Sequence, residues 1–164
     1  MYKSQTYGNL EINQIPEKIL QYYNKNKHYE SQFSIVIGTD SQNFSDTKIV
    51  TVIAVVCEGH GGIYFYEVSR EPRIDNIRQK LYEETSRSLN TTMELLKIME
   101  DTEEYNILID KCHFVVHVDA GKTNKSKTKE LIPELVGWIK SCGYDCEVKP
   151  DSYVASSIAD KLSK

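Results

Sequence analysis

The stretch FSIVIGTDSQ, residues 33–42, starts as a run of β-branched apolar residues and stops on a short polar cluster around Asp40. The apolar run is typical of a buried strand. The cluster Gly38-Thr39-Asp40-Ser41 is typical of a turn, which taken alone would explain Asp40. The same arrangement recurs in FVVHVDAG, residues 114–121, where an apolar strand ends on Asp119 and a glycine follows. The sequence therefore presents two strands that each deliver a carboxylate.

The chain has 164 residues, of which 40% are hydrophobic and 27% are charged. These values predict one globular domain, residues 1–164, in which 1–32 form an N-terminal helical extension and 33–164 form the core. No apolar run approaches the roughly 18 residues of a membrane span, and the first twenty residues contain no hydrophobic signal region. We expect a cytoplasmic protein with no membrane partner. The net charge of −4 argues against a generally basic nucleic-acid-binding surface.

The spacing of the four cysteines matches neither a paired CxxC zinc site nor a disulfide framework; they are Cys57, Cys112, Cys142 and Cys146. We expect reduced, structural thiols. Cys142 and Cys146 could form half of a zinc site with His113 or His117, although no other feature of the sequence supports that interpretation.

Hydrophobic periodicity and turn residues predict the following elements. The expected strands are residues 33–39, 48–59, 62–70, 113–119 and 145–149. The expected helices are residues 16–27, 74–100, 128–143 and 151–164, and Pro133 requires the third of these to begin near 132 or to be kinked.

The order of these elements is three strands, a long helix, then strand, helix, strand and helix. The short spacings between the first three strands predict an antiparallel meander, and the later helices suit crossover connections. We therefore expect an α/β fold with a mixed five-stranded sheet covered by helices. If strands 33–39 and 113–119 are parallel neighbours, Asp40 and Asp119 emerge side by side at one edge, where sites form in such sheets.

Two further carboxylates are candidates for the same site. Glu84 falls on or near the buried stripe of helix 74–100, whereas Glu83 is rotated away, and Asp151 opens the last helix. Carboxylates brought together repel one another unless a cation neutralises them. Oxygen ligation suits Mg²⁺ or Mn²⁺, and such arrays commonly hold two ions for phosphodiester hydrolysis.

Each of these residues also has a purely structural interpretation. Asp40 alone suits a turn, Asp119 alone suits a strand-end Asx turn, Glu84 alone suits a helix salt bridge, and Asp151 alone suits an N-cap. The site prediction depends on their combination.

The segments IGTDSQ, EETSRS, VHVDAG and KPDSYVASSIAD resemble the YkuK family, bacterial proteins predicted to adopt the ribonuclease H-like fold. The resemblance runs from about residue 33 to the end. It implies two-metal nuclease chemistry in which Asp40, Glu84, Asp119 and Asp151 are the catalytic and metal-binding residues. One departure is that several ribonucleases H place a histidine before the last helix, where this chain has Lys149 and Pro150.

Asp160 is the alternative to Asp151 as the fourth carboxylate. The two residues lie nine positions apart, some 13 Å along an ideal helix, so both cannot serve one metal pair. If the last helix begins at the edge where Asp40 and Asp119 emerge and then runs away from it, Asp151 is the nearer residue. We therefore expect Asp151 to be the ligand.

Residues around the predicted carboxylates suggest how a substrate binds. A nucleotide-binding loop is not expected after Asp119, because the first glycine of such a loop is missing. The stretch that contains Lys122, Lys125 and Lys127 is better interpreted as a basic segment that binds the backbone of a nucleic acid. Ser41 and Gln42 could hydrogen-bond a substrate or cap a turn.

The sequence thus predicts a metal-dependent nuclease, a hydrolase that acts on RNA, an RNA–DNA hybrid or branched DNA with two Mg²⁺ or Mn²⁺ ions. The alternative is a non-catalytic nucleic-acid-binding or scaffold module that keeps the ribonuclease H-like fold without productive metals.

Overall fold

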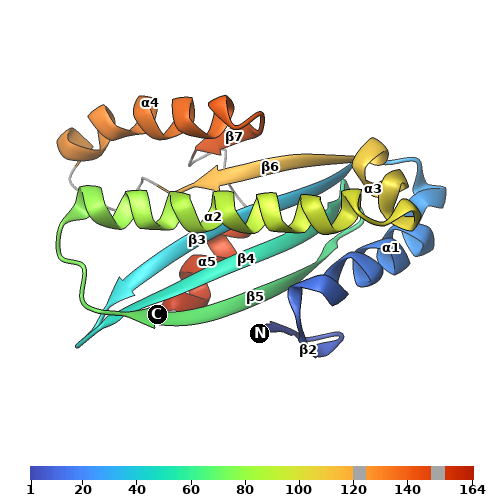
Figure 1. The fold of residues 1–164 in the computed structure, drawn as a ribbon, viewed down its shortest axis with the longest axis horizontal. Helices are drawn as coiled ribbons and strands as arrows, with labels where there is room; N and C mark the ends of the chain where they lie inside the picture. The colour runs from blue at the N-terminus through green and yellow to red at the C-terminus, as the bar shows by residue number, and fades with distance from the viewer. Residues whose placement is uncertain (120–124, 149–153) are drawn as a thin grey trace.

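The computed structural model describes residues 1–119, 125–148 and 154–164 (Figure 1). Its strands form one mixed sheet in the order β2-β1-β5-β4-β3-β6-β7. They are β1 Tyr2–Ser4, β2 Gly8–Leu10, β3 Phe33–Asn43, β4 Thr47–Cys57, β5 Gly62–Glu71, β6 Cys112–Val118 and β7 Asp145–Val148. Its helices are α1 Ile15–Asn26, α2 Ile77–Glu100, α3 Asn106–Lys111, α4 Lys125–Ser141 and α5 Val154–Ser163, with short 3₁₀ turns at Ile12–Gln14, Lys27–Tyr29 and Glu103–Tyr105.

The centre of the sheet confirms the predicted topology. β3, β4 and β5 form the antiparallel meander, and β6 pairs in parallel with both β3 and β7. The predicted count of five strands is wrong, because β1 and β2 add a hairpin at the β5 edge. Each of these two strands has three residues, which is too short for an alternating pattern to appear in the sequence.

β3 is longer than expected, and this changes the position of Asp40. Asp40 pairs with Val50 within the antiparallel ladder, which continues as far as Asn43 and Thr47. The cluster at residues 38–41 is therefore strand and not turn, because the β3–β4 hairpin reverses only after Asn43. Asp40 lies inside a strand and not at its tip.

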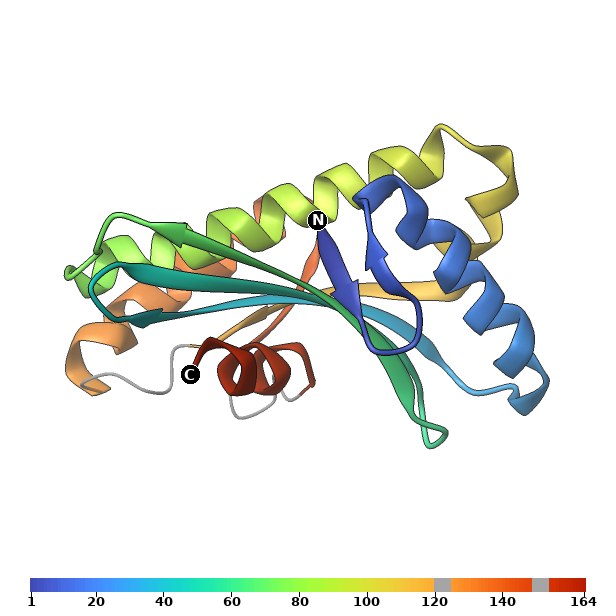
Figure 2. The same ribbon diagram turned by 90° about the horizontal axis from the view of Figure 1, so that it is seen from below.

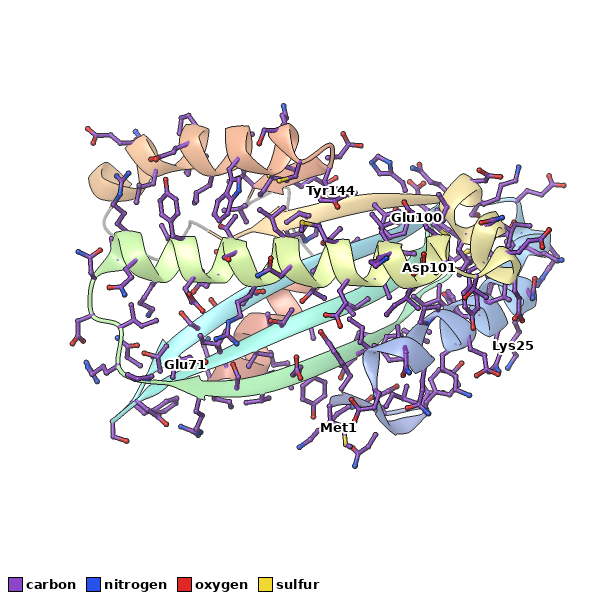
Figure 3. All side chains as sticks on the ribbon, in the orientation of Figure 1. Met1, Lys25, Glu71, Glu100, Asp101 and Tyr144 are labelled. Atoms are coloured by element: carbon purple, nitrogen blue, oxygen red, sulfur yellow. The ribbon has the colours of Figure 1, made fainter. Side chains whose placement is uncertain are left out.

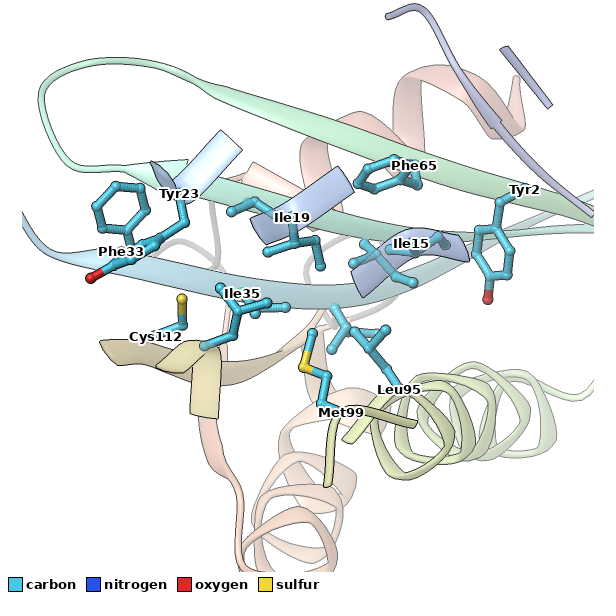
Figure 4. Packing of buried hydrophobic residues seen from close by; sticks show 14 of the residues in the cluster. Tyr2, Ile15, Ile19, Tyr23, Phe33, Ile35, Phe65, Leu95, Met99 and Cys112 are labelled. Atoms are coloured by element: carbon cyan, nitrogen blue, oxygen red, sulfur yellow. The ribbon is translucent and has the colours of Figure 1, made fainter. Parts of the chain in front are cut away.

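Helices cover both faces of the sheet (Figure 2). α2 and α5 lie on opposite sides. The face under α2 contains the largest apolar cluster, in which Ile35 of β3, Phe65 of β5, Ile19 of α1 and Leu95 of α2 are all fully buried (Figure 4). Because full burial of one such side chain stabilises a fold by about 1.5–3 kcal/mol, this cluster fixes α1 and the second half of α2 on the sheet.

α4 and α5 are held by smaller clusters. Leu135 and Ile139 of α4 pack with Val116 of β6 on the α2 side. Pro133 lies inside α4, so a helix start near 132 is excluded. On the other face, Ala155 and Ala159 of α5 pack in a cluster of valines from β3 and β4. Small alanines let α5 approach the sheet closely.

Candidate active site

The parallel pairing of β3 with β6 places Asp40 near Asp119. The last paired residues are Gly38 and His117, and two residues further along each segment lies an aspartate, Asp40 within β3 and Asp119 directly after β6. Both aspartates are buried, with 6% and 8% of their surfaces exposed. This juxtaposition agrees with the prediction from the sequence, although Asp40 reaches it from within β3.

Glu84 joins these aspartates from α2. It is buried on the helix face that packs on β3, and Ser41 Oγ donates a hydrogen bond of 2.5 Å to Glu84 Oε1. Because side chains alternate along a strand, Ser41 faces α2 whereas Asp40 faces the other side of β3. Ser41 thus orients Glu84 from within the strand and does not cap a turn.

One pocket collects the predicted residues. It has a volume of about 300 Å³ and is lined by Asp40, Ser41, Gln42, Ile77, Lys80, Leu81, Glu84 and Asp119. Three of the four predicted carboxylates and both predicted polar substrate contacts therefore border the same space. Lys80 is an addition that the sequence analysis did not assign to the site.

The protonation of Glu84 is strongly perturbed in this pocket. Burial raises the pKa of Glu84 to about 8, and the negative charge of Asp40 adds to the effect. The hydrogen bond from Ser41 and the positive charge of Lys80 oppose this rise without cancelling it. In the absence of a cation, Glu84 is therefore largely protonated at neutral pH.

The last turn of α5 contacts Asp40 from the opposite face of the sheet. Ser163 Oγ donates a hydrogen bond of 2.7 Å to Asp40 Oδ2, and Lys48 Nζ donates one of 2.7 Å to the carbonyl oxygen of Leu162. In Figures 1 and 2 the C-terminus lies near the C-terminal half of β3.

The expected direction of the last helix is therefore wrong. α5 was expected to start at the aspartates and run away from them, but its final turn is the part that reaches Asp40. α5 begins only at Val154, six residues after β7 ends. The direction of α5 therefore gives no reason to prefer Asp151 over Asp160.

Several predicted residues fall outside what the structure describes. Asp151 and Lys122 belong to the undescribed segments 149–153 and 120–124. Lys125 and Lys127 lie in the first turn of α4, but their side chains are not described. Their roles stay predictions.

His117 is a buried residue of β6, two positions before Asp119. Its Nε2 lies 3.1 Å from Glu147 Oε2 on the neighbouring strand β7, and burial lowers the pKa of His117. Its Nδ1 has no hydrogen-bond partner among the described residues.

The four cysteines are free thiols, with Cys57 and Cys112 buried.

The residues fit a hard divalent cation in kind but do not form a finished site. Carboxylate and hydroxyl oxygens are ligands that Mg²⁺ and Mn²⁺ accept. Within residues 1–119, 125–148 and 154–164, however, no group of three histidine, cysteine or acidic side chains is arranged so that it could hold a metal ion. Ser41 donates a hydrogen bond to one carboxylate oxygen of Glu84, and Ser163 donates one to a carboxylate oxygen of Asp40.

Ser163 and Lys80 are the site residues that the sequence analysis missed. Lys80 stands four positions before Glu84, so helical spacing alone could have placed it on the same face of α2. Ser163 follows Ala155 and Ala159 at the same spacing, which marks it as a residue facing the sheet. Its contact with Asp40 depends on the direction of α5, which no local pattern specifies.

The ribonuclease H-like family matches residues 14–164, which is nearly the whole chain. The chain belongs to this family. Strands β3 to β7 of the seven-stranded sheet form the five-stranded mixed sheet that the resemblance to this family implied.

The ribonuclease H-like chain is also 35% identical over 147 residues to the uncharacterized protein YkuK of Bacillus subtilis (strain 168). The match covers 84% of this chain and 83% of that protein. No solved structure gave a significant match.

None of the helices in the described residues combines the length and hydrophobicity that crossing a membrane requires.

Proposed function

We propose that the protein is a nuclease that uses Mg²⁺ or Mn²⁺ to hydrolyse phosphodiester bonds in nucleic acid. The observation that carries this proposal is the single pocket that Asp40, Glu84 and Asp119 border in a ribonuclease H-like chain. Buried carboxylates are costly unless they are neutralised, so their placement together is best explained by a cation that binds between them. A fourth carboxylate comes from the C-terminal segment, where Asp151 and Asp160 are the candidates.

The protein groups have definable tasks in this proposal. The bound ions would supply an activated water and stabilise the charge that develops on the phosphate. Glu84 releases its proton when a cation replaces that proton as the neutralising charge. Ser41 and Ser163 hold the carboxylates of Glu84 and Asp40 in fixed orientations, which limits the reorganisation needed on binding.

The charge distribution favours one direction of substrate approach. On the β5 side of α2, a second pocket of about 290 Å³ is lined by Glu11, Glu67 and Glu94 along with Arg87 and other polar residues. Figure 3 shows Met1 and Glu71 on this side, away from α4. Three glutamates against Arg87 and the N-terminal ammonium of Met1 leave a small excess of negative charge, which does not favour a polyanion.

The α4 side of α2 is more favourable for a nucleic acid. α2 and α4 run in the same direction, since Arg78 pairs with Glu134 and Tyr82 stacks on Trp138. The first turns of both helices therefore lie at the same end of the molecule, and the first turn of α2 borders the pocket through Ile77 and Lys80. The predicted contacts Lys125 and Lys127 belong to that end of α4.

A non-catalytic nucleic-acid-binding module is the second candidate. It is favoured by the lack of a three-ligand metal cluster in the part of the chain that the structure covers. Under this alternative, the carboxylates contribute to the fold or to a weak cation site, and no metal-dependent cleavage occurs.

Cleavage of a substrate panel separates these two functions. Labelled RNA, DNA, RNA–DNA hybrid and four-way junction DNA are incubated with wild type, Asp119→Asn and Asp101→Asn in Mg²⁺ or Mn²⁺. Asp101 is an exposed aspartate that follows α2 and pairs with Lys97, so its variant controls for loss of one negative charge. We expect wild type and Asp101→Asn to cleave at least one substrate and Asp119→Asn to cleave none. Cleavage by Asp119→Asn at the wild-type rate contradicts the proposal.

A further inference from the structure

Lys80 is the one cationic side chain among the described residues that line the carboxylate pocket. It lies on α2 one turn before Glu84 and is half-buried. The positive charge of Lys80 lowers the pKa of Glu84. The ammonium group of Lys80 is therefore close enough to interact electrostatically with the Glu84 carboxylate. The pocket thus combines three acidic groups with one positive group at its α2 wall.

The ammonium group of Lys80 makes no ion pair within the described part of the chain. Among the described side chains, no carboxylate oxygen lies within 4.0 Å of its Nζ atom. The arginines on the same helix differ: Arg78 pairs with Glu134, and Arg87 pairs with both Glu71 and Glu83. A lysine kept purely to balance Glu84 would be expected in direct contact with it.

The N-terminal end of α2 adds a second source of positive potential at the same wall. α2 begins at Ile77, which also lines the pocket, and the helix continues for 24 residues. Aligned peptide dipoles give the first turn of a long helix a partial positive charge that favours anions. Lys80 lies at the end of this first turn, so both contributions act on the same space.

We propose that Lys80 binds a non-bridging oxygen of the substrate phosphate at this pocket. The inference rests on the proposed function and assigns a substrate contact that neither the sequence analysis nor the family match identifies. Once cations neutralise the carboxylates, a phosphodiester that enters the pocket meets an ammonium group that pairs with none of the described carboxylates. Lysine is a common phosphate ligand because it acts as a compact point charge.

The test compares Lys80→Ala, Lys80→Arg and Lys97→Ala with wild type. Lys97 is an exposed lysine on the same helix, so its variant removes an equal charge away from the pocket. Binding of fluorescein-labelled RNA and DNA oligonucleotides is measured by anisotropy in Ca²⁺ over a range of salt concentrations, and cleavage is measured in Mn²⁺. Thermal melting confirms folding, and Lys80→Gln replaces the alanine variant if that variant is unfolded.

We expect Lys80→Ala to bind oligonucleotides about tenfold more weakly, with a salt dependence reduced by about one counterion. Lys80→Arg should restore most of the affinity, and Lys97→Ala should match wild type. If wild type and Lys80→Ala bind with the same affinity and salt slope, the Lys80 proposal is wrong.

The outcomes separate this proposal from the nuclease proposal. Weaker binding by Lys80→Ala together with no cleavage by wild type supports Lys80 as a phosphate ligand and contradicts the nuclease function. If wild type cleaves and Lys80→Ala binds and cleaves as wild type does, the nuclease function is supported and the Lys80 proposal is contradicted. If wild type binds none of the oligonucleotides, both proposals fail.

Discussion

Ser163 Oγ donates a hydrogen bond to Asp40 Oδ2 across 2.7 Å, although the two residues lie 123 positions apart. The contact joins the last turn of α5 to the middle of β3, and both side chains are buried. A hydrogen bond to a charged group in a buried setting is worth more than one at the surface. The end of the described chain is therefore coupled to the orientation of a predicted metal ligand.

Removal of the Ser163 hydroxyl should affect both stability and activity. In Ser163→Ala, Asp40 loses a buried donor, which should lower the free energy of unfolding by about 1–3 kcal/mol. The rate of metal-dependent cleavage should fall by about tenfold or more, because Asp40 is less well oriented. Chemical denaturation and single-turnover cleavage measure the two effects.

Two further variants test the specificity of this effect. Ser163→Thr keeps the hydroxyl and should recover part of the activity. Ser141→Ala removes an exposed hydroxyl at the end of α4 and should behave as wild type. A Ser163→Ala protein with unchanged cleavage would show that the contact is structural only.

The direction of α5 bears on the choice between Asp151 and Asp160. Asp160 stands three residues before Ser163, in the part of the helix that reaches Asp40, whereas Asp151 precedes the helix. We now expect Asp160→Asn to be folded and to lose most of its Mn²⁺-dependent cleavage, and Asp151→Asn to retain it. The opposite pattern would restore Asp151 as the fourth carboxylate.

The raised pKa of Glu84 predicts a specific dependence of stability on pH. The folded protein keeps the Glu84 proton up to about pH 8, whereas the unfolded chain releases it near the ordinary value of 4.5. Between these values the folded state binds more protons, so the contribution of Glu84 to stability falls as pH rises and is constant above pH 8.

Glu84→Gln isolates this contribution because glutamine does not ionise. Relative to wild type, the variant should gain stability between pH 5 and pH 8, by an amount on the order of 1–4 kcal/mol in the absence of metal. Denaturation by urea at several pH values measures the difference. A difference between the two proteins that does not change with pH would contradict the raised pKa.

The lysines after Asp119 are expected to contact phosphates without reading sequence. The triple variant Lys122→Ala, Lys125→Ala, Lys127→Ala should bind oligonucleotides more weakly than wild type, with a smaller salt dependence. A triple variant of the exposed residues Lys25, Lys97 and Lys111 carries the same charge change and should bind more tightly than the first. Figure 3 shows Lys25 at the opposite end of the molecule from Glu71. Equal affinities of the two triple variants would remove the lysines from the binding surface.

The sequence was informative wherever a repeating pattern specifies an element. Alternating and continuous apolar runs predicted β3 to β7. The sequence analysis placed Asp40 beside Asp119 on the condition that β3 and β6 are parallel neighbours, and the structure meets that condition. Helical spacing placed Glu84 on the buried face of α2, where the structure has it. The juxtaposition of three carboxylates follows from these elements together.

Features that depend on long-range packing were not predictable in this way. The three-residue strands β1 and β2 form because they pair with β5 and with each other, and not because of their own sequences. The Ser163–Asp40 contact depends on the direction of α5. The extension of β3 past Asp40 depends on its pairing with β4, whereas Gly38, Asp40 and Ser41 taken alone favour a turn.

The central claim is that Asp40, Glu84 and Asp119 together bind a divalent cation. Isothermal titration of Mn²⁺ into wild type, Asp119→Asn and Asp101→Asn tests it without reference to a substrate. We predict saturable binding to wild type and Asp101→Asn, with a matching rise in melting temperature because the ion binds only the folded state, and binding at least tenfold weaker to Asp119→Asn. Mn²⁺ binding of equal affinity in all three proteins, or none in wild type, would contradict the account.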